Sequence, residues 1–367
     1  MNKKQLFSFL LLFIGMTPLL GMEITTHYYD NNDNLPGRMQ SLLNDPLFDE
    51  FGVNLYVASH KNIINTMKEL PKRGATITGT FGKHYKNDDI SHIHGLSFEE
   101  DEHGKYWRAK GTDSEGKEHT KCLITKAHPT YNAYRNHDSM IEVENDPDFF
   151  DQIEYTMNSY SPVKKKQKID NTPIKNSAYS SLKYNINKSL AKRIDNIANN
   201  KDDDRKLEMA TMNLTDKITA NSLTNAAKKG VNVALLVNKS ALTKKSIPLF
   251  KKIEKAGGHV SVFDPEDKQH RILHLGTTRI ATAKKCLVIH STGNLTEEGN
   301  EQHNILSMFP NNLPLNTASA QHFEKVKKEC TPLEEAIPLF EANKENKIQK
   351  RKANPTTKNN NAKKVKK

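Results

Sequence analysis

The sequence predicts an α/β protein made of two similar halves, each a mixed or parallel sheet flanked by helices. Two short runs of β-branched and apolar residues, 52–59 and 230–237, both begin with Gly-Val-Asn. Each run is followed by an amphipathic helical pattern, and each helix ends near a glycine that leads into another strand-like run. Alternation of buried strands and helices is typical of α/β folds. We expect the two halves to pack about a pseudo-twofold axis.

The strands and helices of the two halves are expected in the same order. Gly74 and Gly257 mark the helix ends, since glycine is a common residue just after a helix. A further strand is expected before each Gly-Val-Asn strand, and these two strands are interpreted as counterparts. In order, the first half is expected to contain strands 23–29 and 52–59, helix 63–70 and strand 75–80, and the second half strands 207–213 and 230–237, helix 247–253 and strand 259–263.

The N-terminus has the pattern of a secretory signal peptide. Asn2-Lys3-Lys4 is followed by an apolar stretch, 6–16, that is too short to span a membrane comfortably. We therefore expect an exported protein, secreted or periplasmic, whose signal peptide covers residues 1–21. The remaining chain divides by composition into a first repeat (22–159), a basic linker (160–182), a second repeat (183–342) and a disordered basic tail (343–367).

The overall charge favours partners that carry phosphate. The chain has 367 residues and a formal net charge of +12. Such a balance suits phospholipid head groups, nucleic acid or other anions, and the basic linker and tail could touch either a membrane surface or nucleic acid. The three cysteines include no C-x-x-C pair, so neither a disulfide framework nor a zinc site is indicated. We expect no cofactor, and a monomer with an internal pseudo-dimer.

His119-Thr120-Lys121 is a candidate phosphate-binding motif in the first half. On a β-strand, residues two apart lie on the same face, so the imidazole and the ammonium would point to one ligand. A lysine neutralises phosphate charge, and a histidine can attack phosphorus or move a proton. His274 holds a similar place in the second half. Each half then has a polar turn, at Thr130-Tyr131-Asn132 and at Thr292-Gly293-Asn294.

These motifs and their order resemble the phospholipase D superfamily, best over 190–309 and less closely over 23–156. The resemblance implies two α/β repeats whose H-x-K-x4-D motifs meet at the pseudo-twofold axis. It implies that His119 and His274 are nucleophile and general acid/base, in an order left open, and that Lys121 binds phosphate. Asn132 and Asn294, with Thr130 and Thr292, would orient the substrate, and no metal is implied.

The motifs also depart from the family pattern. Lys126 stands where the first motif would have Asp, and Gly276 and Ala281 replace the Lys and Asp of the second. Arg279 or Lys284 could supply the missing cation from nearby. Three functions are consistent with the sequence: an exported phosphodiesterase that degrades phospholipid through a phosphohistidine, a nuclease of the same fold, and a catalytically weakened protein that binds anionic ligands.

Overall fold

The computed structural model describes residues 22–29, 35–83, 88–100, 102–130, 136, 138–158, 169, 175–264 and 272–353. The predicted signal peptide (1–21), Asn132, most of the predicted linker and the residues after Ala353 lie outside the described residues. Within these ranges, no helix is long and apolar enough to cross a membrane.

The first half folds around a seven-stranded sheet. Its strands are ordered β1-β7-β6-β5-β2-β3-β4. β2, β3 and β4 are parallel to one another, and the remaining neighbours are antiparallel. The strands are β1 (Glu23–Tyr29), β2 (Glu50–Leu55), β3 (Thr76–Gly82), β4 (Leu96–Glu99), β5 (Lys105–Thr112), β6 (Glu118–Thr125) and β7 (Asp138–Glu144).

The second half repeats this order and adds one strand. Its sheet is ordered β15-β11-β10-β9-β12-β13-β14-β8, with β9, β10 and β11 parallel. Strand β10 is apolar and buried on both faces, as expected of a strand inside the parallel part of a sheet. The strands are β8 (Ser177–Ser180), β9 (Lys206–Thr211), β10 (Asn232–Asn238), β11 (His259–Phe263), β12 (Gly276–Ala281), β13 (Cys286–Ser291), β14 (Ile305–Pro310) and β15 (Cys330–Pro332).

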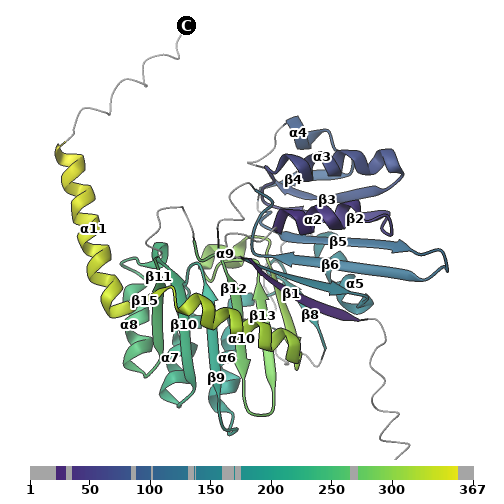
Figure 1. Ribbon diagram of the computed structural model, residues 1–367. Helices are drawn as coiled ribbons and strands as arrows, with labels where there is room; N and C mark the ends of the chain where they lie inside the picture. Colours follow the sequence, from purple (N-terminus) through teal and green to yellow (C-terminus); the bar gives the residue numbers. More distant parts are fainter. Residues whose placement is uncertain are drawn as a thin grey trace, which may run out of the picture.

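The helices lie against the sheets, and several begin at a side-chain cap. Asn185, Asp216 and Asn312 each accept a hydrogen bond from a backbone N–H of the first turn. The helices are α2 (Leu35–Asn44), α3 (Lys61–Glu69), η1 (Leu70–Arg73), α4 (Asp88–Ser91), α5 (Pro147–Asn158), α6 (Ile186–Asn199), α7 (Lys217–Lys228), η4 (Lys239–Ala241), α8 (Ile247–Lys255), α9 (Glu297–Glu301), α10 (Leu313–Lys327) and α11 (Leu333–Ala353). Figure 1 shows the first half at the upper right and the second at the lower left.

The duplication is present, but its register differs from the predicted one by one strand. In the two sheet orders, β2 corresponds to β9, and β3 to β10. The Gly-Val-Asn runs therefore belong to β2 and β10, which are not counterparts. The strand at 23–29 is β1, an edge strand antiparallel to β7, and its counterpart is β8 at the matching edge beside β14. Short apolar parallel strands have similar sequences, so sequence similarity alone did not show which strand of the first half corresponds to which strand of the second.

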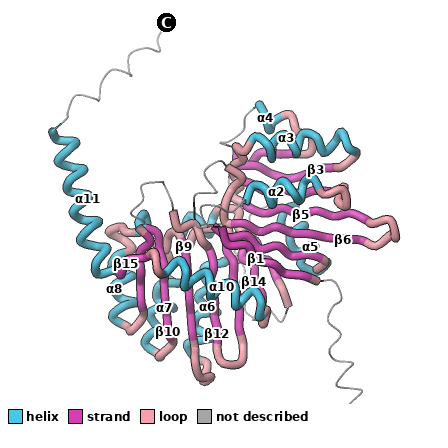
Figure 2. Tube along the Cα trace, viewed as in Figure 1, coloured by secondary structure: helices cyan, strands magenta, loops and turns pink. Residues whose placement is uncertain are grey.

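The two halves share a core. Side chains of β5, β6 and β7 form one buried cluster with those of β13 and β14. Phe149 of α5 and Phe309 of β14 meet in it with ring centroids 5.7 Å apart. Figure 2 shows strands of both sheets approaching each other near the centre of the molecule. Because this cluster lies between the sheets, it fixes how the ends of the strands face one another.

Two predicted boundaries need correction. Strand β8 lies inside the stretch predicted as linker, since its backbone pairs with β14 from Ser177 to Ser180. Helix α11 continues to Ala353, so the first part of the predicted disordered tail is helical. Glu334 and Glu335 lie in its first turn, where a carboxylate favours the helix, and the later Ala, Lys and Gln residues are good helix formers.

Candidate active site

His103 and His274 occupy equivalent positions in the two halves. His103 lies two residues before Lys105, the first residue of β5, and His274 lies two residues before Gly276, the first residue of β12. β5 and β12 are counterparts in the two sheet orders. The two imidazoles are close enough that a charge on His274 lowers the pKa of His103. The H-x-K motif of the first half is therefore His103-Gly104-Lys105.

Each of these histidines is held by a residue of the other half. His103 Nδ1 lies 3.0 Å from Asn304 Oδ1, and His274 Nδ1 lies 2.7 Å from Asp138 Oδ1. Asp138 opens β7, and Asn304 immediately precedes β14, so these partners are themselves counterparts. A partner on Nδ1 fixes the orientation of the ring and leaves Nε2 as the nitrogen available for chemistry. The site thus requires both halves.

Two buried lysines converge beside the histidines. Lys105 Nζ and Lys126 Nζ each lie 3.1 Å from the carbonyl oxygen of Thr292, and Lys126 Nζ also donates to the Gly293 carbonyl and lies 3.2 Å from Asn294 Oδ1. Burial lowers the pKa of Lys105 well below its ordinary value, helped by repulsion from Lys126. Burial lowers the pKa of Lys126 to about 7, opposed by the carboxylate of Asp138.

A third imidazole completes the cluster. The rings of His103 and His128 lie 5.7 Å apart, and Tyr56 packs against both, at 5.1 and 5.6 Å. Burial lowers the pKa of both histidines well below its ordinary value, and repulsion from Lys105 lowers it further. Buried basic groups that repel one another are stabilised by an anion among them. The cluster is therefore suited to a phosphate group.

Buried hydrogen bonds next to the cluster connect the two halves. Glu102 Oε2 accepts a hydrogen bond from Asn54 Nδ2 at 2.8 Å and lies 3.0 Å from His303 Nδ1, while His303 Nε2 lies 3.1 Å from the Tyr106 hydroxyl. Hydrogen bonds between buried polar groups hold those groups in place. Since Glu102 and Tyr106 flank the His103 motif, this network positions the motif from the second half.

His119 and Lys121 are not brought together with His274, which corrects the predicted first-half motif. His119 pairs with Gly111 across the β5–β6 hairpin, and its Nε2 lies 2.8 Å from Asp113 Oδ2 in the turn. Lys121 forms ion pairs with Glu142 and with Glu144, the latter at 2.7 Å. The site lies at the other end of β6, about 20 Å along the strand from His119 at 3.3 Å per residue.

The predicted turns lie at or beside the site. Thr292 is fully buried, and its Oγ1 accepts a hydrogen bond from the backbone N–H of Ile305 at 2.9 Å. Asn294 contacts Lys126 as described above. Thr130 follows the equivalent first-half turn, with its N–H 2.7 Å from the His128 carbonyl oxygen. Since β6 and β13 are counterparts that end at Thr125 and Ser291, Lys126 corresponds to Thr292 and His128 to Asn294.

Neither of the two predicted replacement cations reaches the cluster. Arg279 Nη1 forms an ion pair of 2.8 Å with Glu208, and its Nε donates to Asn316 Oδ1 at 2.7 Å. Lys284 lies in the turn between β12 and β13, at the opposite end of these strands from Gly276. The cation that lies beside the histidines is Lys126, at the position where the predicted first-half motif would have an aspartate.

The sequence did not predict four residues of the cluster: Lys105, Lys126, His103 and His128. A signal for His103 and Lys105 exists, because the triplet His103-Gly104-Lys105 runs directly into the apolar residues Tyr106 and Trp107. His274 likewise stands just before its strand. Lys126 and His128 carry no comparable signal, since they depart from the residues found at the second-half turn.

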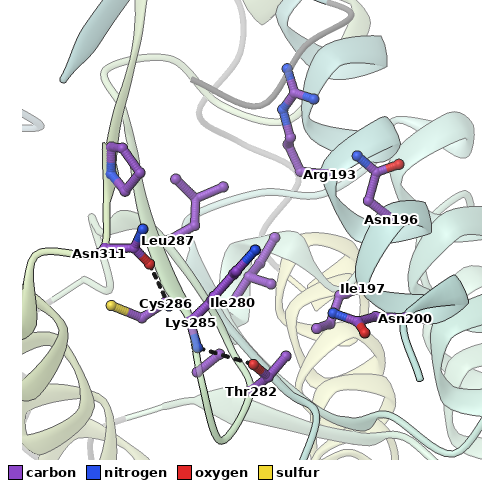
Figure 3. Close-up of a pocket in the computed structure, with 12 residues that line it drawn as sticks. Arg193, Asn196, Ile197, Asn200, Ile280, Thr282, Lys285, Cys286, Leu287 and Asn311 are labelled. Carbon is purple, nitrogen blue, oxygen red and sulfur yellow. Dashed lines mark hydrogen bonds between the residues drawn. The ribbon is translucent and has the colours of Figure 1, made fainter. Parts of the chain in front are cut away.

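A separate pocket of about 340 Å³ opens at the far end of the second sheet (Figure 3). It is lined by α6 residues, including Arg193 and Asn196, and by residues around the β12–β13 turn, including Thr282 and Lys285. This end of the strands is opposite to Gly276 and Ser291, so the pocket is distinct from the histidine cluster. In the described ranges, no group of three or more His, Cys, Asp or Glu residues is arranged to hold a metal ion.

The two-repeat fold, which the sequence predicts through its resemblance to the phospholipase D superfamily, is similar to the folds of two solved structures. Polyphosphate kinase from Porphyromonas gingivalis is similar over 84% of this chain, with a TM-score of 0.57 and 12% identity, and the chain spans half of that protein's length. Phosphatidylserine synthase from Haemophilus influenzae Rd KW20 is similar over 89% of this chain and 94% of its own, with a TM-score of 0.52 and 10% identity. No protein-family model and no curated protein sequence matches the chain.

Proposed function

We propose that this protein is a phosphodiesterase that forms a phosphohistidine intermediate. The observation that carries the proposal is the reciprocal arrangement of His103 and His274, each held at Nδ1 by the opposite half beside two lysines. Two imidazoles on either side of a phosphorus atom allow in-line displacement, with the lysines binding the phosphoryl oxygens.

The partners of the two histidines suggest their roles. His103 Nδ1 lies 3.0 Å from Asn304 Oδ1 and 2.9 Å from Lys105 Nζ, and burial keeps the pKa of the ring low, so the ring is uncharged. With the Nδ1 proton donated to the amide oxygen, Nε2 carries the lone pair for attack. His274 is paired with the carboxylate of Asp138, which is fully buried and stabilises a positive charge on the ring. We therefore assign His103 as the nucleophile and His274 as the proton donor.

The reaction then proceeds in two balanced steps. His103 Nε2 forms a bond to phosphorus as the bond to the leaving oxygen breaks, and that oxygen takes the proton of His274. Water next attacks the phosphorus, giving its proton to His274, and the bond from phosphorus to His103 breaks. The products are the free alcohol and a phosphomonoester, and both histidines return to their starting state.

Phospholipid is the proposed substrate. The predicted signal peptide favours export to a location where membranes are the most abundant phosphodiesters, and the net charge of +12 favours an anionic membrane surface. Nucleic acid is the second candidate, supported by the same charge and by the Lys-rich stretches 164–168 and 343–367. A weakened active site that still binds these anions is the third candidate, supported by Lys110 and Ala281, which stand where the motifs that begin at His103 and His274 would have aspartate.

Turnover assays with matched variants test the proposal. The purified protein is incubated without added metal with phosphatidylcholine vesicles and with single- and double-stranded DNA. We expect turnover of the lipid, and at least a thousandfold loss in His103→Ala and His274→Ala but not in His119→Ala, which lies in the β5–β6 hairpin. Turnover of DNA alone would favour the nuclease. Absence of turnover with every substrate would contradict both enzymatic candidates.

A further inference from the structure

Position 276 lacks the lysine that its counterpart in the first half carries. Lys105 opens β5, and Gly276 opens β12 at the equivalent place after His274. A lysine cannot simply be restored there. A Cβ added to Gly276 would lie 2.1 Å from the backbone oxygen of Ser291 and 3.2 Å from Cδ of Lys126. The backbone of β13 therefore approaches too closely for a side chain to leave Gly276 in its present position.

The side chain of Lys126 passes through the space beside Gly276. It comes from the first half, from the turn after β6, and it is fully buried. Its counterpart in the second half is Thr292, so the lysine stands where the other repeat has a hydroxyl. Its Nζ reaches the Thr292 carbonyl oxygen, which Lys105 Nζ also contacts.

We propose that Lys126 supplies the second phosphate-binding ammonium of the site, crossing from the first half to the position that Gly276 leaves open. The site would then hold two cations, as a symmetric pair of motifs would provide, but both would come from the first half. Its present partners are carbonyl and amide oxygens of the turn 292–294. A phosphate oxygen would be a stronger partner, since it carries the charge that these oxygens lack.

The surroundings of Lys126 support this assignment. The titratable groups that interact with the charge of Lys126 are Lys105, Asp138 and three histidines, His103, His128 and His290. Asp138 is already paired with His274. Glu102, the other carboxylate that acts on Lys105, is likewise bonded to Asn54 and His303. Both carboxylates near the two lysines are therefore engaged elsewhere, and a bound phosphate would balance the lysine charges. The assignment rests on the proposed phosphate site, although not on turnover.

Binding of inorganic phosphate to the full-length protein, measured by calorimetry at pH 6.5, tests the assignment. We expect Lys126→Met to bind at least tenfold more weakly than wild type, and Lys105→Met to lose a similar factor. Lys121→Met is the matched control, because Lys121 is ion-paired on the body of β6. It should bind as wild type does. Lys126→Thr, which copies Thr292, provides a second variant if the methionine does not fold.

The outcomes separate this inference from the proposed reaction. Weaker phosphate binding in the position 126 variants supports the role of Lys126 even if no phosphodiester is turned over. Wild-type affinity in Lys126→Met or Lys126→Thr, together with a loss in Lys105→Met, would overturn the inference while leaving the reaction possible. Failure of the wild-type protein to bind phosphate would overturn both.

Discussion

Replacement of Lys126 by methionine should change how the stability of the protein depends on pH. The pKa of Lys126 falls from 10.5 to about 7 in the folded state because the side chain is buried. Between these values the unfolded chain holds a proton that the folded chain lacks, so the free energy of unfolding of the wild type rises with pH in this window. Below pH 7 both states are protonated, and the cost of burying the charge is fully present.

The size of this change in the free energy of unfolding follows from the shift in the pKa of Lys126. One pKa unit corresponds to about 1.4 kcal/mol, so the wild type should regain about 3 kcal/mol between pH 7 and pH 9 from this group. Methionine has a similar length and no charge, and replacing buried charges with apolar side chains is often neutral or stabilising. The stability of Lys126→Met relative to wild type should therefore be highest near pH 6 and fall by about 3 kcal/mol by pH 9.

Urea denaturation at pH 6, 7.5 and 9 measures this difference. Trp107, the single tryptophan, is buried, so its fluorescence reports unfolding. Lys121→Met serves as the control, because the ion pairs of Lys121 raise its pKa and its charge is constant over this range. Its relative stability should be independent of pH. A relative stability of Lys126→Met that is equally flat from pH 6 to 9 would refute the reasoning.

Three further predictions follow from the site. Asp138→Asn should lower kcat about 10- to 100-fold, because the charge that supports His274 is lost, and an unchanged kcat would contradict the role of the ion pair. Gly276→Ala should lower the free energy of unfolding, measured by thermal denaturation, by about 1–3 kcal/mol, because the added Cβ would clash with the Ser291 backbone. A variant as stable as the wild type would contradict this, since it would show that the β13 backbone shifts at little energetic cost. The acid limb of kcat/KM should lie below pH 6.5, because the pKa of His103 is lowered, and a limb above that pH would argue against His103 as the nucleophile.

Much of the fold could be predicted from local patterns. The apolar runs became β2, β3, β10 and β11, and the helices at 63–70 and 247–253 became α3 and α8. The two similar halves are present as well. The register of the duplication could not be predicted in this way, because strand order in a sheet depends on contacts between residues far apart in the chain. The edge strands β1 and β8 are weakly marked in sequence, so their equivalence emerged only from the pairing.

That one-strand shift explains the errors in the site. With β2 matched to β10, the expected position of the first-half motif moves one strand along the chain, from His103 before β5 to His119 on β6. His274, Thr292 and Asn294 lie at the cluster, and all three belong to the half that matches the family pattern better. The crossing of Lys126 depends on the close approach of β13 to Gly276. Local sequence patterns do not show how closely the backbones of two neighbouring strands such as β12 and β13 approach each other.

The most direct measurement of the central claim is the identity of the phosphorylated residue. A phosphodiester with a p-nitrophenolate leaving group needs little acid assistance in the first step, so His274→Ala should accumulate the intermediate when it reacts with this substrate. The reaction is quenched in alkali, which preserves phosphohistidine, and the peptides are analysed by mass spectrometry. The mechanism predicts a phosphoryl adduct on His103. An adduct on another residue, or continued turnover in His103→Ala, would contradict it.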